Sequence, residues 1–250
     1  MTTFSLRHLG GPTSLITYGG VRFLTDPTFD QPGEYPIGNR VLVKTTEPVA
    51  SPAEVGAVDA VLLSHDQHAD NLDRGGREYL ATAPLTLTTT SGAERLGGTA
   101  RALPNWTHAD VGGVRVTGLP ALHGPEGAEA KVGEVTGFLL SKDGLPSVYV
   151  SGDNASLDRV REIAGRFGPV PIAVLFAGAA RTPLIDAYLT LESTAAAEAA
   201  EILGADDVVP LHFEGWGHFT QGPDTLAEAF AANGKTRLHL LKPGAEVTLG

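Results

Sequence analysis

The sequence predicts a mixed α/β fold in which β-sheets pack face to face and helices cover their outer sides. The first half of the chain is mostly strand-like, with short apolar or β-branched runs separated by glycines. Strands lead, and strands and helices then alternate in both halves of the chain. This order favours packed sheets with helices outside over a single parallel sheet.

Strands are expected where short apolar or β-branched runs end at turn residues. Two continuous apolar runs, Val58–Ser64 and Ile172–Ala177, have the composition of fully buried strands. Between the early strands and Val58, the segment 26–52 is rich in proline and lacks periodicity, so we expect a long surface loop there. The remaining expected strands are Phe4–Leu9, Ser14–Tyr18, Val21–Thr25, Leu85–Thr90, Val114–Leu119, Val135–Leu140, Ser147–Val150, Val208–Leu211, Arg237–Leu241 and Glu246–Leu249.

Helices are expected where apolar residues recur at helical spacing between a capping residue and a stop signal. Ser156–Phe167 places Leu157, Val160 and Ile163 on one face and is followed by Gly-Pro. Ser91 is positioned to cap a short helix that runs to Leu96. The other expected helices are Leu72–Ala81, Leu191–Leu203 (ended by Gly204) and Asp224–Ala232.

Composition restricts the chemistry that this chain can perform. The 250 residues contain no cysteine, which excludes disulfides, thiol catalysis, thiolate metal sites and iron–sulfur clusters, so any metal must bind to His, carboxylate or amide groups. The net charge of −11 argues against nucleic-acid binding. Without a signal-like N-terminus or a long apolar run, we expect a single cytoplasmic domain over residues 1–250, with no membrane partner. The sequence leaves a homo-oligomer open.

The strongest motif follows the expected buried strand Val58–Ser64. His65, His68 and Asp70 lie within six residues, and a loop can fold such donors onto one cation. The alternative is a polar turn that caps the next helix, with Asp70 or Asn71 at the N-cap.

Three further polar residues each follow the end of an expected strand. They are His123, Asp153 and His212. Each is unspecific alone, since turns and caps use the same residue types. Their joint order, with Asp26 in the early step Leu-Thr-Asp-Pro, resembles the metallo-β-lactamase-fold hydrolases, in particular the ascorbate-phosphate-lactonase-like branch. The similarity extends from about Phe4 to Leu241.

This resemblance implies a four-layer αβ/βα sandwich with a divalent metal at one edge. Zn is the expected ion, one or two per chain, with Mn and Fe as alternatives. The family commonly has the motif His-x-His-x-Asp-His. Here Gln67 stands at the position of the second His, which favours the next residue, His68, as the ligand. Asn71 stands at the position of the last His, and because an amide is a weaker ligand than imidazole, we expect a weaker or empty second site. By resemblance, His65, His68 and His123 form the first metal site, Asp70 and His212 contribute to the second, and Asp153 bridges the two.

Two other residues of the early strands are assigned differently. Asp26 is expected to be a structural hydrogen-bonding group rather than a ligand. His8 precedes the first turn and is expected to be a half-buried strand histidine.

The implied function is hydrolysis of a small ester, lactone or phosphoester by a metal-bound hydroxide. Asp70 or Asp153 would orient the water and take its proton, and His218 would act as a general acid or lie on a surface loop. Arg181 would hold an anionic group of a small-molecule substrate or remain solvated. Trp216 would wall the pocket or pack in the core. The alternatives are a single-iron oxygenase on the same fold and a degenerate, non-catalytic ligand-binding protein.

Overall fold

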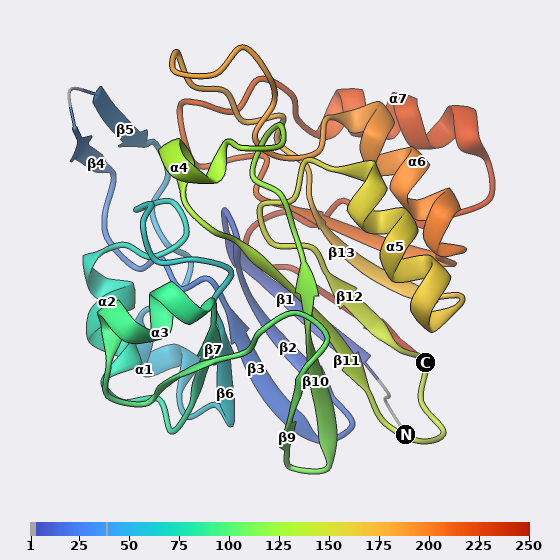
Figure 1. Cartoon of the computed structure of the whole chain (residues 1–250), viewed down its shortest axis with the longest axis horizontal. Helices are drawn as coiled ribbons and strands as arrows, with labels where there is room; N and C mark the ends of the chain where they lie inside the picture. The colour runs from blue at the N-terminus through green and yellow to red at the C-terminus, as the bar shows by residue number, and fades with distance from the viewer. Residues whose placement is uncertain (1–3, 39) are drawn as a thin grey trace.

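Two seven-stranded β-sheets face each other in the computed structural model, which describes residues 4–38 and 40–250 (Figure 1). Residues 1–3 and 39 of the expected 1–250 domain lie outside the described residues. One apolar cluster fills the space between the sheets, with Phe4, Ile16 and Phe23 from one side and Phe138 and Phe176 from the other. Among the described residues, no helix is both long and apolar enough to span a membrane.

The first sheet is built from strands within residues 4–102 and from the last strand. Its order is β16-β1-β2-β3-β6-β7-β8, with β3, β6, β7 and β8 parallel to one another. Its strands are β1 (Phe4–Gly10), β2 (Thr13–Tyr18), β3 (Val21–Thr25), β6 (Ala60–Leu62), β7 (Thr86–Thr88), β8 (Ala100–Ala102) and β16 (Glu246–Leu249).

The second sheet has the order β15-β14-β13-β12-β11-β10-β9. The strands β12, β13, β14 and β15 are parallel, so the carboxyl ends of β12, β13 and β14 lie at one edge. Its strands are β9 (His108–Val111), β10 (Val114–Pro120), β11 (Thr136–Ser141), β12 (Val148–Val150), β13 (Ile172–Phe176), β14 (Asp207–Leu211) and β15 (Arg237–Leu238).

Helices cover the outer face of each sheet, which completes four layers (Figure 1). On the outer face of the first sheet, Leu24 and Leu63 pack with Tyr79 of α2. On the outer face of the second sheet, Leu139 and Leu175 pack against α5, α6 and α7. The expected mixed α/β fold with two packed sheets is therefore confirmed. The helices are α1 (Pro52–Val55), α2 (Arg74–Leu80), α3 (Thr90–Leu96), α4 (Glu129–Val132), α5 (Leu157–Phe167), α6 (Ser193–Leu203) and α7 (Pro223–Asn233).

Several short elements differ from the sequence expectation. The cap of α3 is Thr89, whose side chain accepts from the Gly92 amide, so the expected cap at Ser91 is wrong. Ser91 instead donates to Glu134. The elements β8, β9, α1 and α4 were not expected, because each has only three or four residues, too few to show a period.

The segment 26–52 contains a β-hairpin, β4 (Gly33–Ile37) and β5 (Arg40–Lys44), where a loop was expected. Residues of β5 alternate between inner and outer faces, with Leu42 and Lys44 inward and Val41 and Val43 exposed. The hairpin is anchored at its base, where the Gly217 amide donates to the Val43 carbonyl at 2.9 Å. The hairpin is therefore tied to the segment that follows β14.

A buried ion pair also fixes the base of the hairpin. The Lys44 Nζ lies 3.0 Å from Asp73 Oδ2, and only 5% of the Lys44 side chain is exposed. Asp73 caps α2 through the Gly76 amide and also accepts from the amides of Phe29 and Asp30. The pair thus joins the hairpin to the start of α2.

Replacing Lys44 by Met should lower the free energy of unfolding by about 1–3 kcal/mol, because Asp73 loses its ion partner but keeps its amide donors. Urea denaturation of the parent and the variant measures this change. Lys235→Met, at an exposed position, is the matched control and should change stability by less than about 0.5 kcal/mol. Equal losses in both variants would show that the pair is not stabilising.

Candidate metal centre

Four strand ends bring the candidate ligands to one edge of the two sheets. The loop 64–71 follows β6 of the first sheet, and His123 follows β10 of the second. Asp153 follows β12 and His212 follows β14, with β13 between them in parallel register. Polar residues at the carboxyl ends of parallel strands converge in this way without any long-range sequence signal.

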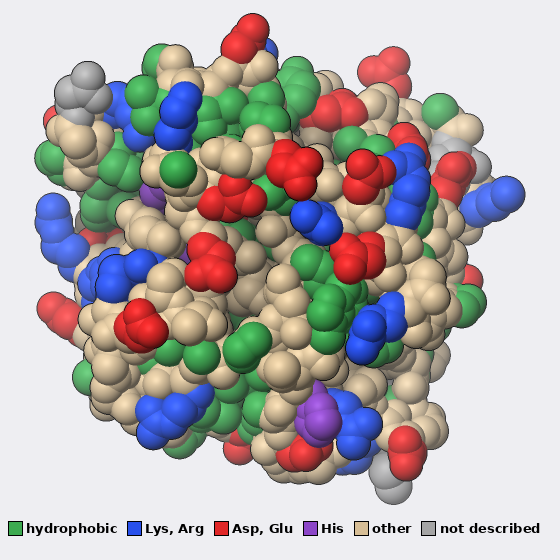
Figure 2. All heavy atoms as spheres, viewed as in Figure 1, with side chains coloured by type: hydrophobic (Ala, Val, Ile, Leu, Met, Phe, Trp, Pro, Cys, Tyr) green, Lys and Arg blue, Asp and Glu red, His purple; other side chains and the backbone are tan. Residues whose placement is uncertain are grey.

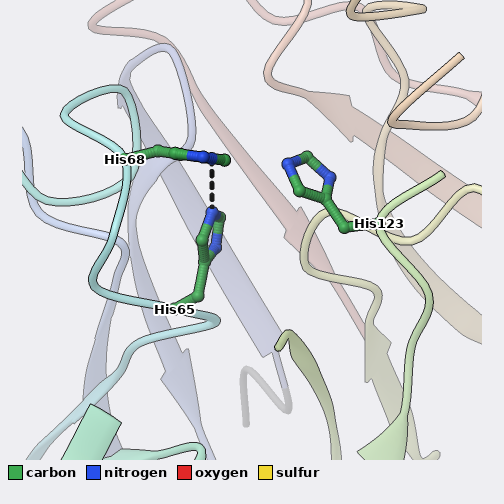
Figure 3. Close-up of side chains that lie close together, drawn as sticks. All are labelled: His65, His68 and His123. Atoms are coloured by element: carbon green, nitrogen blue, oxygen red, sulfur yellow. Dashed lines mark hydrogen bonds between the residues drawn. The ribbon is translucent and has the colours of Figure 1, made fainter. Parts of the chain in front are cut away.

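Three histidines form the first cluster (Figure 3). One ring nitrogen from each of His65, His68 and His123 lies within 4.8 Å of the others. His65 Nε2 and His68 Nδ1 are 3.0 Å apart, and the His123 ring faces both from the opposite sheet. The structure therefore brings His68, and not Gln67, together with the other two imidazoles.

Two carboxylates and an imidazole form the second cluster. Ligand atoms of Asp70, Asp153 and His212 lie within 4.8 Å of one another, and all three residues are buried. His212 Nδ1 is 2.9 Å from Asp153 Oδ1, and His212 Nε2 is 3.3 Å from Asp70 Oδ2. Asp153 Oδ2 also lies 3.8 Å from His123 Nδ1, so Asp153 stands between the two clusters.

Hydrogen bonds fix which nitrogen of two imidazoles is free to bind a cation. His123 Nδ1 donates to the Leu189 carbonyl at 2.8 Å, which leaves the Nε2 lone pair free. Ser64 Oγ donates to Asp26 Oδ1 and therefore accepts from His65 Nδ1 at 3.0 Å. Such outer hydrogen bonds orient metal-binding histidines in proteins. Asp26 acts here as a structural group, as its sequence position indicates.

Burial and charge divide the histidines into two protonation states. Burial lowers the pKa of His68 to about 4 and holds the pKa of His65 well below its ordinary value, so both rings are neutral and can donate a lone pair. Burial acts in the same direction on His212, but the carboxylates of Asp153 and Asp70 outweigh it and raise the pKa of His212 to about 10.

The carboxylates of the second cluster are ionised. Burial raises the pKa of a carboxyl group, yet the neighbouring histidines more than compensate for it here. They hold the pKa of Asp70 and of Asp153 below the ordinary value, chiefly through His218 and His212 for Asp70 and through His212 for Asp153. The second cluster therefore binds a proton where a cation would otherwise balance the two carboxylates.

The unsatisfied atoms of the site match the requirements of a divalent cation. Buried polar atoms are nearly always hydrogen-bonded. Within the described residues, the buried atoms His123 Nε2, His212 Nε2 and Asp70 Oδ1 accept or donate no hydrogen bond. Imidazole nitrogens and carboxylate oxygens are the donors that Zn and related ions prefer. Both clusters therefore fit a metal ion.

Asn71 does not point its oxygen at the second cluster. Its Nδ2 donates to Asp153 Oδ1 at 3.2 Å and lies 3.4 Å from Ser64 Oγ. The amide thus replaces a ligand by a donor that orients Asp153. Because Asn71 stands where the family commonly has a histidine ligand, a weaker second metal site remains a prediction.

The ligand-bearing segments are held by contacts that the sequence did not reveal. The Asp66 carboxylate accepts hydrogen bonds from Nε of Arg95 at 3.0 Å and from its Nη2 at 2.5 Å, and the Asp66 backbone carbonyl accepts one from Arg77. His212 adopts a left-handed backbone with φ of 56°, a costly conformation that the surrounding packing must maintain. His8 is fully buried in β1, deeper than expected, and contacts the Leu241 carbonyl.

A small cavity lies over the metal centre, and only two of the three residues expected around the substrate line it. His218 lines it, with Nε2 3.0 Å from Asp70 Oδ2, and Arg181 lines it while paired with the exposed Asp186 at 2.7 Å. Trp216 is not among its lining residues: it is buried at 4% exposure against Tyr35, which favours packing over a pocket wall. The lining residues are Ile37, Arg40, Leu42, His68, Asp70, His123, Val132, Ala180, Arg181, Thr182, Leu189 and His218.

Comparisons with known proteins agree with this architecture. A metal-dependent hydrolase of Pyrococcus abyssi is 26% identical over 212 residues, which cover 83% of this chain and 89% of that protein. A possible metal-dependent hydrolase from Veillonella parvula has the same fold, with a TM-score of 0.84, 17% identity and full coverage of both chains. The isothiocyanate hydrolase from Delia radicum gut bacteria superimposes with a TM-score of 0.83 at 20% identity, covering 98% of each chain.

The family assignment covers most of the chain and all four ligand-bearing strand ends. The family model described as the beta-lactamase superfamily domain matches residues 21–213, a range that begins at β3 and ends one residue after His212. The expected resemblance to the metallo-β-lactamase-fold hydrolases is thereby confirmed, while the lactonase-like branch stays a prediction, and this chain belongs to the beta-lactamase superfamily domain family.

Proposed function

We propose that this metal-dependent hydrolase of the metallo-β-lactamase fold cleaves a small ester, lactone or phosphoester. The observation that carries the proposal is the pair of clusters, each with three convergent ligand atoms, beside one small cavity. Zn is the ion we propose, because the first cluster is entirely imidazole and the second adds carboxylates. We propose a small-molecule substrate, because the cavity beside the clusters is small and partly apolar.

Hydrolysis at this site needs a nucleophile, a proton acceptor and a proton donor. A divalent cation, when bound, lowers the pKa of a water molecule and polarises a carbonyl or phosphoryl oxygen. Asp70 and Asp153 are ionised and buried, which supports them as groups that orient water, whereas their lowered pKa makes them weak acceptors of its proton. His218 contacts Asp70 through Nε2 and keeps Nδ1 without a hydrogen-bond partner, so Nδ1 is available to the leaving group, to which we propose that His218 donates a proton.

The two alternative functions fit the geometry less well. A single-iron oxygenase uses one metal site, whereas the second cluster also has three ligand atoms within 4.8 Å of one another. A degenerate, non-catalytic protein has no need for free imidazole nitrogens and ionised carboxylates beneath a cavity. Both observations favour a hydrolase.

Chelation of the purified protein tests this proposal. We expect exhaustive removal of divalent ions to abolish turnover of a panel of p-nitrophenyl esters, lactones and phosphodiesters, and expect Zn or Mn to restore it. His123→Ala should lose metal and activity together, because its free Nε2 belongs to the first cluster. Turnover that persists after complete chelation would rule out a metal-dependent reaction, and oxygen consumption by an iron-containing preparation would favour the oxygenase.

A further inference from the structure

The cavity over the metal centre has an apolar wall and a basic rim. Its walls come from the hairpin, α4 and the loop between β13 and α6, which meet at one end of the molecule (Figure 1). Arg40, Arg181 and Thr182 line the cavity together with His68, Asp70, His123 and His218 of the metal centre. The apolar lining residues are Ile37, Leu42, Val132, Ala180 and Leu189.

Arg40 points inward although it lies at the tip of a surface hairpin. It begins β5 and pairs in register with Ile37, and the alternation of the strand places it on the same face as Leu42 and Lys44. The outer face of the strand instead carries Val41, which is 48% exposed. A tip arginine could point to solvent at little cost, so its inward placement requires a reason.

Among the described residues, no carboxylate forms an ion pair with Arg40. Lys44 on the same face is paired with Asp73 and Arg181 is paired with Asp186. Within residues 4–38 and 40–250, the side chain of Arg40 donates only to the Thr182 hydroxyl. Basic and apolar side chains also gather at the hairpin end of the molecule, although the whole chain carries a charge of −11 (Figure 2).

The small size of the cavity and the hydrogen bond of Arg40 indicate how this side chain would contact a ligand. The cavity between the hairpin and the facing loop is small, with about 30 Å³ open to the centres of water molecules, so a substrate group that enters it comes close to Arg40. The hydrogen bond from Arg40 to Thr182 joins these two parts. A carboxylate or phosphate oxygen is a stronger acceptor for guanidinium than a hydroxyl, and it can take two N–H groups at once.

We propose that Arg40 determines specificity by binding an anionic group of the substrate, a carboxylate or phosphate separated from the scissile bond by a short apolar segment. The anion takes the place of the Thr182 hydroxyl, and the apolar segment lies along Ile37 and Leu42. This inference rests on the proposed hydrolase function and specifies its substrate class. Arg40 lies in the segment without periodicity, which is why the sequence did not identify it.

Matched substrates test the role of Arg40 in the metal-loaded enzyme. We compare p-nitrophenyl butyrate with the mono-p-nitrophenyl ester of glutaric acid, which is similar but ends in a carboxylate, and with a phosphate-ended analogue. The parent should prefer at least one anionic ester by about 10–100-fold in kcat/KM. In Arg40→Met this ratio should fall to near one, and Arg40→Lys should keep part of it, because Lys retains charge without the planar fork.

A control variant and a binding measurement separate this inference from the proposed function. Arg115→Met removes an exposed arginine of β10 and should keep the substrate ratio of the parent. Titration calorimetry with glutarate and with propyl phosphate measures anion binding without turnover, and identifies which anion is preferred. If no ester is hydrolysed but Arg40→Met loses anion binding, the proposed function fails and this inference stands. A parent without anion preference in either assay, or an unchanged preference in Arg40→Met, would overturn it.

Discussion

Asp153→Asn is expected to abolish measurable hydrolysis and to weaken metal binding beyond the roughly 10–100-fold that loss of an outer-shell partner causes. The carboxylate lies between the two clusters, 2.9 Å from His212 Nδ1 and 3.8 Å from His123 Nδ1, so both sites lose a negative donor. The amide that replaces it is a weaker donor for a cation. Metal content per chain, measured after equilibration with Zn and desalting, checks this result together with the rate of ester hydrolysis.

The metal-free protein offers an independent readout of the same substitution. The carboxylates raise the pKa of His212 to about 10 in the parent, and removal of one of them should lower it, as NMR titration of the ring can show. Because the pKa of His212 is higher in the folded chain than in the unfolded chain, its protonation stabilises the fold fully at a pH below about 6.5, the ordinary histidine pKa. This stabilisation is lost as the pH rises from about 6.5 to about 10. The metal-free parent should therefore lose stability over that range, and Asp153→Asn should lose less.

An exposed aspartate provides the control for charge removal. Asp110→Asn changes an exposed carboxylate of β9 and should keep the metal content, the hydrolysis rate and the His212 pKa of the parent. Full metal content in Asp153→Asn would remove this residue from the ligand set and leave the second cluster as an ordinary buried ion pair.

The sequence located the ligand candidates because each follows a buried strand. Apolar runs such as Val208–Leu211 identify the strand, and the next polar residue is then fixed at its end. The parallel order of β12, β13 and β14 turns separate strand ends into neighbours, which explains why Asp153 and His212 meet. Local pattern places these residues at strand ends and sheet topology brings them together, while the resemblance to a known family supplied their roles as ligands.

The parts that the sequence did not predict depend on contacts between distant segments. The orientation of His123 is set by the carbonyl of Leu189, and a backbone acceptor leaves no trace in the residue type. The hairpin forms because its base pairs with residues after β14 and because Lys44 finds Asp73, neither of which is visible as a local period. Arg40, presented by that hairpin, was hidden for the same reason.

Gly178→Ala is expected to destabilise the protein by about 3 kcal/mol and to weaken metal binding, although Gly178 binds nothing itself. A Cβ at this position would lie 2.3 Å from the His212 carbonyl oxygen and 2.9 Å from the Cα of Phe213. Both are backbone atoms, so the strain cannot be relieved by rotation of a side chain. The His212 backbone is already in the left-handed region and has little freedom to yield. Thermal or urea unfolding of the metal-free protein measures the loss, and competition with a chelator measures the metal affinity.

Gly165→Ala is the same kind of substitution, but it is expected to increase the stability of the protein. Gly165 lies on the exposed side of α5, and a Cβ at this position would meet no other atom within 4 Å. Alanine should therefore stabilise the helix by about 0.5–1 kcal/mol and keep the metal affinity of the parent. Because the two variants add the same methyl group, a difference between them of about 3–4 kcal/mol isolates the clash at His212. Equal stability and metal affinity in both would mean that the end of β14 adapts freely. The position of His212 would then not depend on its close contact with Gly178, two residues after β13.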